Sequence, residues 1–587
     1  MSVVQAQDVR LAQQYQQEGE YEKAAAIYEQ LMNQNQRNDY YFDRYIECLV
    51  ALNQFNAAEQ SVKKQMRKSP DNIRLHVTYG NLLALQDKET AANDEYQTAI
   101  KKLPPDKYQI TNLANAFLEL SKYQLAVEVY EKGEKLLNEP YLFAYNLAEL
   151  HRRKGDYEKM VAEYLNSLAS NAGRLETIKS LLQRYLPTEN YEFLKTQLYD
   201  LVQKEPNADY YTELLTWVFI QEKDYSKALR QVRALDRRAG ENGGRVFDLA
   251  QIAINDGDYD AAIEAFQYII EKKGPTSSFY LDAKRDLLRA KRSKIVEGYN
   301  YTQQDLVGLQ VEYTTFLQEF GKNKLTAPII IEYAELEALY VNNLDKAIEL
   351  LSELIEYPGM NRGVLANGKL DLANYYLMQG EIWESTLLYS QVDKEFVEDL
   401  LGHEARYLNA KLSYYAGDFQ WAQAQFDVLK SSTSKLIAND ALDMAVFIMD
   451  NLGLDTTTVP LQHYASAELL VFQNRFADAF LKLDTLGKDF PEHGLQDDIL
   501  YLKAQIYKKQ RRYQEAETAY QAIITQYKEE IRADNAMFEL AQLYENQLKD
   551  IEKAKSLYES LFIDFSGSTF AVEARKRYRV LRGDQVQ

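Results

Sequence analysis

The chain has 587 residues, with 68 Lys or Arg against 88 Asp or Glu, and a formal net charge of −20. This acidity argues against broad nucleic-acid binding, because neutralising phosphates requires a basic surface. The single cysteine, Cys48, excludes an intramolecular disulfide and a cysteine-cluster metal site. Hydrophobic residues make up 46% and charged residues 27%, while Gly (24) and Pro (11) are scarce. This is the composition of a folded, mostly helical protein.

Residues 1–6 form an unusual start. Val4-Gln5-Ala6 has the small-residue spacing of a signal-peptidase site, but neither a basic nor an apolar region precedes it. The two interpretations are a disordered start and the remnant of a secretory signal. No run of 18 apolar residues occurs in the chain, so no transmembrane helix is predicted.

Residues 7–276 repeat in eight copies with a period of 34 residues. Each copy contains two stretches with apolar residues at i, i+3, i+4 and i+7, which predicts two amphipathic helices joined by a polar turn. One position holds a small or apolar residue in every copy: Ala24, Ala58, Ala92, Ala126, Met160, Leu194, Ala228 and Ala262. Three residues earlier stand Tyr21, Phe55, Glu89, Tyr123, Tyr157, Tyr191, Tyr225 and Tyr259.

These residues resemble the tetratricopeptide repeat (TPR) family, whose unit is 34 residues long. Ala92 and Tyr96, with Gly80 and Pro104, match its motif closely. The sixth copy departs most, because Leu182 stands at another position that other copies fill with a small residue. The resemblance implies an all-α fold, a right-handed superhelical solenoid with a concave groove that binds peptide segments or helices.

Residues 330–581 carry the same motif with longer spacings of 37 and 38 residues and one step of 57, which predicts longer helices or loops. They are predicted to form a second TPR-like array that ends in a capping helix. Residues 277–329 lack the motif but have helical periodicity, and we expect a helical connector; a flexible linker is the alternative. Residues 582–587 are a tail. The positions that carry the second array are Ala347, Ser385, Ala422, Ala479, Ala516 and Ala554.

The last stretch also resembles the repeats of bacterial envelope proteins, namely outer-membrane-assembly lipoproteins and periplasmic cell-division coordinators. The residues concerned are 536–541, Ala554, and Phe565-Ser566-Gly567-Ser568 before residues 571–575. Ser566 stands where those proteins often carry Pro. This resemblance implies a periplasmic protein of a cell-envelope complex; a cytoplasmic location is the alternative.

Projecting the family's groove onto this sequence gives a set of candidate partner-binding residues rich in Tyr, Trp and Asn. Tyr and Trp combine a large apolar contact area with a hydrogen-bonding group, which suits recognition of a partner protein. Much of the Tyr content, 45 residues, is expected to be repeat core. The candidates are Asn81, Tyr108, Asn112, Asn115, Tyr145, Asn146, Glu149, Tyr210, Trp217 and Phe247.

No catalytic, cofactor or metal motif is predicted. The five His are dispersed and form no i, i+4 pair, and Cys48 and His151 are expected to pack inside repeats. We therefore expect a non-enzymatic scaffold that binds a peptide or partner protein, in envelope assembly, secretion or division. One alternative is a cytoplasmic assembly or regulatory TPR protein. Another is a helical-solenoid enzyme or glycan binder, which would need carboxylates and Trp gathered in one pocket.

Overall fold

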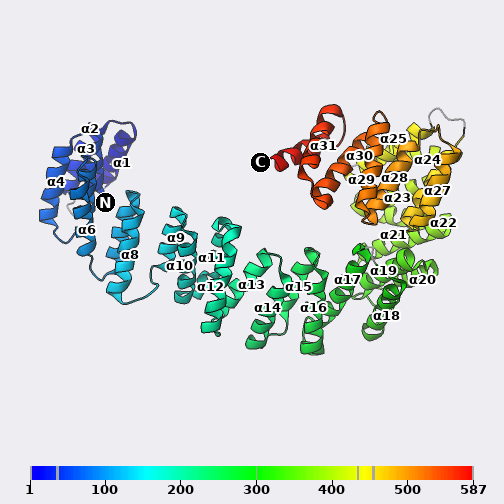
Figure 1. Ribbon diagram of the computed structural model, residues 1–587, viewed down its shortest axis with the longest axis horizontal. Coiled ribbons are helices and arrows are strands. Elements are labelled where there is room, and N and C mark those ends of the chain that lie inside the picture. Colours follow the sequence, from blue (N-terminus) through cyan, green and yellow to red (C-terminus); the bar gives the residue numbers. More distant parts are fainter. Residues whose placement is uncertain (1–2, 35–38, 299–300, 432–434, 453–456, 585–587) are drawn as a thin grey trace. The chain divides into compact units, whose positions relative to one another are not determined.

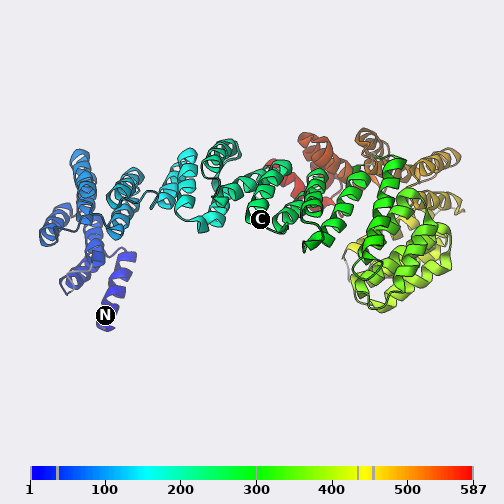
Figure 2. The same ribbon diagram turned by 90° about the horizontal axis from the view of Figure 1, so that it is seen from below.

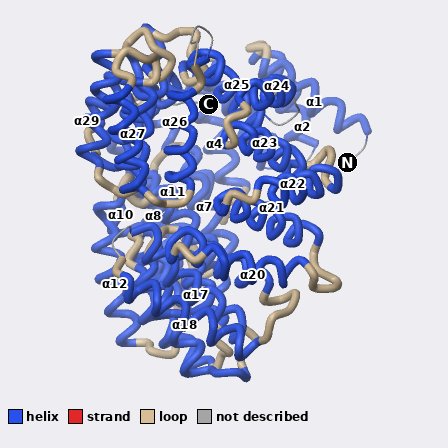
Figure 3. The backbone as a smooth tube through the Cα atoms, turned by 90° about the vertical axis from the view of Figure 1, so that its right-hand side faces the viewer, coloured by secondary structure: helices blue, strands red, loops and turns tan. Residues whose placement is uncertain are grey.

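The computed structural model describes residues 3–34, 39–298, 301–431, 435–452 and 457–584, and these contain helices and no strand (Figures 1 and 3). The predicted all-α repeat fold is confirmed. The chain divides into two compact units, Met1–Glu241 (unit 1) and Asn242–Gln587 (unit 2). Residues 1–2 of the predicted start and 585–587 of the predicted tail lie outside the described residues. The boundary between the units falls inside the predicted array 7–276, and the proposed array limits stay predictions.

Unit 1 is a series of antiparallel helix pairs, each made of a first and a second helix (Figure 1). Two short 3-10 turns, η1 (Ala172–Arg174) and η2 (Thr188–Asn190), interrupt the series. Its helices are α1 (Val3–Gln17), α2 (Tyr21–Gln34), α3 (Asp39–Ala51), α4 (Phe55–Lys68), α5 (Arg74–Ala84), α6 (Glu89–Lys101), α7 (Lys107–Glu119), α8 (Tyr123–Leu137), α9 (Ala144–Lys154), α10 (Tyr157–Ser170), α11 (Leu175–Tyr185), α12 (Tyr191–Lys204), α13 (Asp209–Gln221) and α14 (Tyr225–Ala239).

Unit 2 continues with helix pairs of the same kind (Figure 2). It also contains the π turns η3 (Ile269–Lys273), η5 (Glu337–Val341) and η6 (Tyr544–Leu548) and the 3-10 turn η4 (Gly274–Thr276). Its helices are α15 (Gly244–Asn255), α16 (Tyr259–Tyr268), α17 (Tyr280–Gly298), α18 (Gln303–Phe320), α19 (Ala327–Leu336), α20 (Leu344–Ile355), α21 (Arg362–Gln379), α22 (Ile382–Glu395), α23 (Leu400–Tyr415), α24 (Phe419–Leu429), α25 (Lys435–Leu452), α26 (Val459–Phe472), α27 (Phe476–Asp489), α28 (Gln496–Lys509), α29 (Tyr513–Gln526), α30 (Ala533–Leu543), α31 (Ile551–Asp564) and α32 (Ala571–Arg582).

The predicted register is confirmed helix by helix. Every second helix in the 34-residue region begins at the residue three positions before the small one, from Tyr21 in α2 to Tyr259 in α16. The small position itself is fully buried, as at Ala126 with an exposed fraction of 0%. A small residue there lets the two helices approach closely. Substituted copies keep the position buried: Met160 and Leu194 are also 0% exposed.

The turn between paired helices has one conformation throughout the described repeats, with a single exception. The residue two positions before the second helix has a positive φ, for example +73° at Gly155 and +58° at Lys223. This left-handed conformation ends the first helix and reverses the chain. The exception is the sixth copy, where Pro187 precedes η2. The residues with this conformation are Gly19, Asn53, Asp87, Ser121, Gly155, Lys223, Gly257, Asn342, Gly380, Gly417, Asn474, Arg511 and Lys549.

Longer first helices account for the longer repeats of unit 2. α21 has 18 residues and α23 has 16, against 11 for α5 and 13 for α7. Where the first helix is short, as in α19 and α30, a five-residue π turn extends it. The 57-residue step contains one additional helix, α25, which packs on α24, and the next pair is α26 with α27.

α26 brings distant parts of unit 2 together. Gln473 Nε2, just after α26, donates to the Met378 carbonyl oxygen of α21 at 3.2 Å. Asn474 Nδ2 donates to the Leu339 carbonyl oxygen at 3.2 Å. The side chain of Phe472 packs against the hydrophobic cluster built mainly by α18–α23. One end of the surface formed by α19, α21 and α23 is thus covered by the chain itself.

Candidate partner-binding surfaces

A pocket of about 360 Å³ lies on the surface made by the first helices of unit 1, between α3, α5 and α7. We call such a surface, built from first helices of successive repeats, the first-helix face. Asn81 contributes to the lining, and Ile46, Val77 and Leu82 form apolar parts of it. A pocket shared by three consecutive repeats can hold an extended segment along the array rather than a compact small molecule.

Arg74 joins the three helices of this pocket. Its Nη2 lies 3.2 Å from Asp43 Oδ2 of α3 and 2.8 Å from Glu119 Oε2 of α7. Its Nη1 donates to Asn112 Oδ1 at 3.3 Å. Because the guanidinium is held from both sides, the three helices present a pre-organised surface, which lowers the entropic cost of binding.

The remaining candidates on α7 are accessible to solvent. The Tyr108 side chain is 73% exposed, and Asn115 is exposed on the same helix. An aromatic ring this exposed at the start of a first helix can contact a partner without rearrangement. Neither residue lines the pocket that contains Asn81.

The candidates on α9 are mostly engaged within the repeat. Tyr164 Oη donates to Glu149 Oε1 at 2.5 Å, and Arg152 Nη2 donates to Glu149 Oε2 at 2.9 Å. Burial, followed by the hydrogen bond to Glu149, raises the pKa of Tyr164 well above its ordinary value. Asn146 Nδ2 is 3.5 Å from Tyr130 Oη, and the Tyr145 ring lies 6.1 Å from that of Tyr164.

Tyr210 and Trp217 lie on α13 and are both partly buried. The Tyr210 ring is 4.5 Å from the Tyr211 ring, and the Trp217 ring is 6.3 Å from the Tyr191 ring. Each therefore contributes one face to packing and keeps some area accessible. This arrangement fits an aromatic anchor, but it equally fits the edge of a core.

Phe247 lies in unit 2 and begins a second accessible region. Its ring packs between those of Phe266 and Phe279, at 5.6 and 5.3 Å. With Gln251 of α15 and charged residues of α17 it lines a pocket of about 410 Å³. The candidate set therefore spans both units, and its role in binding a partner stays a prediction.

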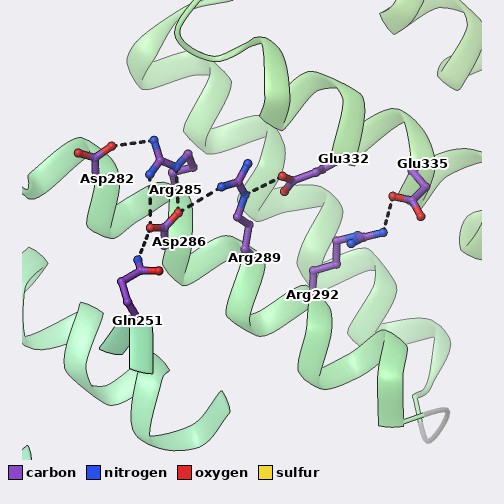
Figure 4. A network of polar contacts seen from close by, with 8 residues as sticks. All are labelled: Gln251, Asp282, Arg285, Asp286, Arg289, Arg292, Glu332 and Glu335. Atoms are coloured by element: carbon purple, nitrogen blue, oxygen red, sulfur yellow. Dashed lines mark hydrogen bonds and ion pairs between the residues drawn. The ribbon is translucent and has the colours of Figure 1, made fainter. Parts of the chain in front are cut away.

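A ladder of ion pairs runs across α15, α17 and α19 beside this pocket (Figure 4). Gln251 donates to Asp286 at 2.6 Å, and Arg285 pairs with Asp282 at 2.7 Å. Arg289 Nε reaches Glu332 of α19 at 2.6 Å, and Arg292 Nη2 reaches Glu335 at 2.6 Å. The cations of α17 are thus consumed by carboxylates of the neighbouring helices.

The first-helix face of α19, α21 and α23 holds a further pocket, of about 400 Å³. Asp371 and Glu404 line it beside Glu332, with Asn367 and Asn374 from α21. Burial, followed by the charges of Glu335 and Glu404, raises the pKa of Asp371 to about 7. This pocket is the most acidic of those described on the first-helix faces, and sequence analysis did not find it.

Two tryptophans lie outside these pockets, on consecutive second helices of unit 2. Trp383 on α22 is 84% exposed and Trp421 on α24 is 59% exposed. Trp421 and the exposed Val428 border a pocket of about 350 Å³ on the α22–α24 side. The enzyme or glycan-binding alternative required Trp and carboxylates in one pocket; here Asp393 of that pocket is paired with Arg406 at 2.5 Å.

Reactive side chains are mostly buried. Within the described residues, no three His, Cys, Asp or Glu side chains are placed to hold a metal ion. Cys48 and His151 are buried, as their sequence context predicted. Burial raises the pKa of the Cys48 thiol to about 11 and lowers the pKa of His151.

Tetratricopeptide-repeat family models match residues 111–173, 217–278, 464–530 and 501–563, and a further one matches residues 9–39. Both units therefore carry tetratricopeptide repeats, and that part of the predicted resemblance is confirmed. No curated protein sequence matches the chain.

Solved structures with a similar succession of helices share little sequence with this chain. A chain of the Naa15/Naa10 complex bound to HypK-THB is 14% identical, with 99% of this chain and 94% of that chain covered and a TM-score of 0.27. Yeast Tom70 is 12% identical, with 98% of each chain covered and a TM-score of 0.27. A tetratricopeptide repeat protein from Parabacteroides merdae ATCC 43184 is 13% identical over 58% of this chain and 99% of that chain, with a TM-score of 0.19.

Among the described helices, none combines the length and the apolar character needed to cross a bilayer.

Proposed function

We propose that this protein is a non-enzymatic scaffold that binds a peptide segment or partner protein on the first-helix faces of its TPR units, within a bacterial cell-envelope complex. The observation that carries the proposal is the pocket between α3, α5 and α7, to which three consecutive repeats each contribute. A binding surface assembled from one helix per repeat suits an extended ligand, since every repeat adds a short stretch of contact.

The charge of the chain supports a protein ligand. At −20 the protein repels nucleic acid and anionic lipid surfaces in general. Exposed Tyr108 and partly buried Trp217 supply the aromatic contact area that partner recognition uses. The periplasmic location and the roles in assembly, secretion or division rest on the sequence resemblance of residues 535–583 to envelope TPR proteins.

Site-specific photo-crosslinking in the native cells tests this proposal. A photoreactive phenylalanine analogue replaces Tyr108 on the first-helix face or, as a control, Tyr199, which is 47% exposed on the second helix α12. We expect discrete protein adducts from position 108 and none of the same mass from position 199. Equal adducts from both positions would contradict binding at the first-helix face.

Fractionation of the same cells before crosslinking tests the location. We expect the protein and its adducts with the periplasmic or outer-membrane fraction. Recovery in the cytosol alone would replace the envelope proposal by that of a cytoplasmic assembly protein, while leaving the scaffold function intact.

A further inference from the structure

The pocket between α19, α21 and α23 presents negative charge that nothing in the described part of the chain neutralises. Glu332 is paired with Arg289 and Glu335 with Arg292, both at 2.6 Å. Asp371 and Glu404 line the same pocket, and neither makes a hydrogen bond or ion pair with a described residue. The available cations of α17 are taken by other carboxylates, so neutralisation of Asp371 and Glu404 needs a charge from outside.

The position of Asp371 makes this charge unfavourable in the unliganded protein. The carboxylate is largely buried in the pocket wall, and the nearest charges, Glu335 and Glu404, are of the same sign. Removing a carboxylate from water without a counter-charge costs free energy. A ligand cation seated beside Asp371 and Glu404 recovers that free energy, which makes the pocket selective for positive charge.

The walls of the pocket suit the stem of a long basic side chain. Ile331 and Val364 line it together with Leu408, and they lie on three different helices, α19, α21 and α23. Lys and Arg carry three or four methylene groups that pack on apolar surface while the charged end reaches polar groups. A compact inorganic cation would leave these walls uncovered.

Two amides flank Asp371 on the same helix. Asn367 lies four residues before it and Asn374 three residues after it, so the three side chains share one face of α21. Asn374 Oδ1 accepts from Tyr389 Oη at 2.5 Å, which leaves its Nδ2 to donate. Amide donors and acceptors next to a charged pocket can bond the backbone of an extended segment.

We infer that this pocket binds a Lys or Arg side chain of a partner's extended segment, with Asp371 and Glu404 holding the cation and Asn367 and Asn374 contacting the backbone beside it. The inference rests on the proposed scaffold function and names the chemistry of its ligand in unit 2. It predicts a partner segment that is basic, complementary to an acidic pocket.

Selection from a phage-displayed library of random 12-residue peptides tests the inference with the full-length protein. We expect enriched peptides to carry Lys or Arg at one or two fixed positions. Synthetic versions should lose affinity at least tenfold on an Asp371→Asn/Glu404→Gln variant. Their affinity should also fall with added salt, because part of the recognition is electrostatic.

The matched control is Glu381→Gln/Glu384→Gln, which removes two charges from exposed side chains at the start of α22. This variant should bind the selected peptides as the wild type does. Peptides without basic residues, or with equal affinity for the pocket variant, would overturn the inference while the scaffold proposal stands. A selection that enriches no binding peptide would count against both. Circular dichroism of each variant establishes that it is folded.

Discussion

Arg532 donates from Nε to Asp498 Oδ1 over 2.7 Å, and the two side chains are 9% and 0% exposed. A second nitrogen of Arg532, Nη1, lies 3.2 Å from Asp443 Oδ1 of α25. The guanidinium thus connects the helix inserted in the 57-residue step to the pairs that follow it. Removing one partner of a buried ion pair leaves the other charge without compensation.

Arg532→Met should therefore lower the stability of the protein by about 3–5 kcal/mol, the range for breaking a buried pair. Urea denaturation followed by circular dichroism measures the change. The matched control is Arg512→Met, which removes an exposed pair with Glu515, 48% and 45% exposed, and should cost less than about 1 kcal/mol. The double variant Arg532→Met/Asp498→Asn should recover part of the loss. Equal effects of Arg532→Met and Arg512→Met would contradict this account.

Gly80 is required by the close approach of α5 and α6. A Cβ at this position would lie 2.5 Å from Cε1 of the buried Tyr96 ring. Gly80→Ala should therefore lower the stability by about 1–3 kcal/mol through overpacking, although alanine is the better helix former. Differential scanning calorimetry gives the shift in melting temperature.

The control for Gly80 is Gly308→Ala in α18. Nothing lies within 4 Å of a Cβ there, so only the helix propensity changes, and the variant should gain up to about 1 kcal/mol. A gain at both positions would mean that Tyr96 moves aside without cost.

The helix pairs could be read from the sequence because one repeat unit recurs in register. The first residues of the second helices, such as Tyr123 and Tyr259, followed from counting 34 residues. The exceptional turn at Pro187 in the sixth copy accompanies the departure noted there, but its 3-10 geometry depends on local backbone angles that the motif does not encode.

The acidic pocket could not be found in this way. Asp371 and Glu404 are two carboxylates among 88 acidic residues, and what distinguishes them is the absence of a partner. Whether a carboxylate is paired depends on side chains of other helices, as Arg289 shows by reaching Glu332 over 43 residues. Likewise, the packing of α26 on α21 joins residues about a hundred positions apart, beyond the reach of a 34-residue pattern. For the binding residues, sequence placed Asn81 and Asn112 on one face but missed Arg74, which holds that face together.

Cys48 provides a chemical probe of unit 1. The thiol is 0% exposed, and burial raises its pKa to about 11. Since the thiolate is the reactive form, Cys48 should react with Ellman's reagent at pH 8 at least a hundredfold more slowly than a free thiol. Unfolding in 6 M guanidinium should restore the full rate. As the chain has one Cys, the rate reports on this site alone. Fast reaction in the folded protein would show that α3 opens readily.

Asp371 should make the stability of unit 2 depend on pH in a direction opposite to that of most carboxylates. Its pKa is raised to about 7 in the folded protein, above the ordinary 3.8 that applies after unfolding. Between these values the folded state binds more protons than the unfolded state, so stability falls as pH rises from about 4 to about 7. Asp371→Asn removes the titration. The variant should match the wild type near pH 4 and exceed its stability by about 1–3 kcal/mol at pH 8, less than the full shift would give because water reaches the pocket. Thermal unfolding at both pH values measures the difference. Glu381→Gln, the same loss of charge at an exposed side chain, should show no such gain. A variant that is equally or less stable than the wild type at pH 8 would mean that Asp371 has a counter-charge in the unliganded protein.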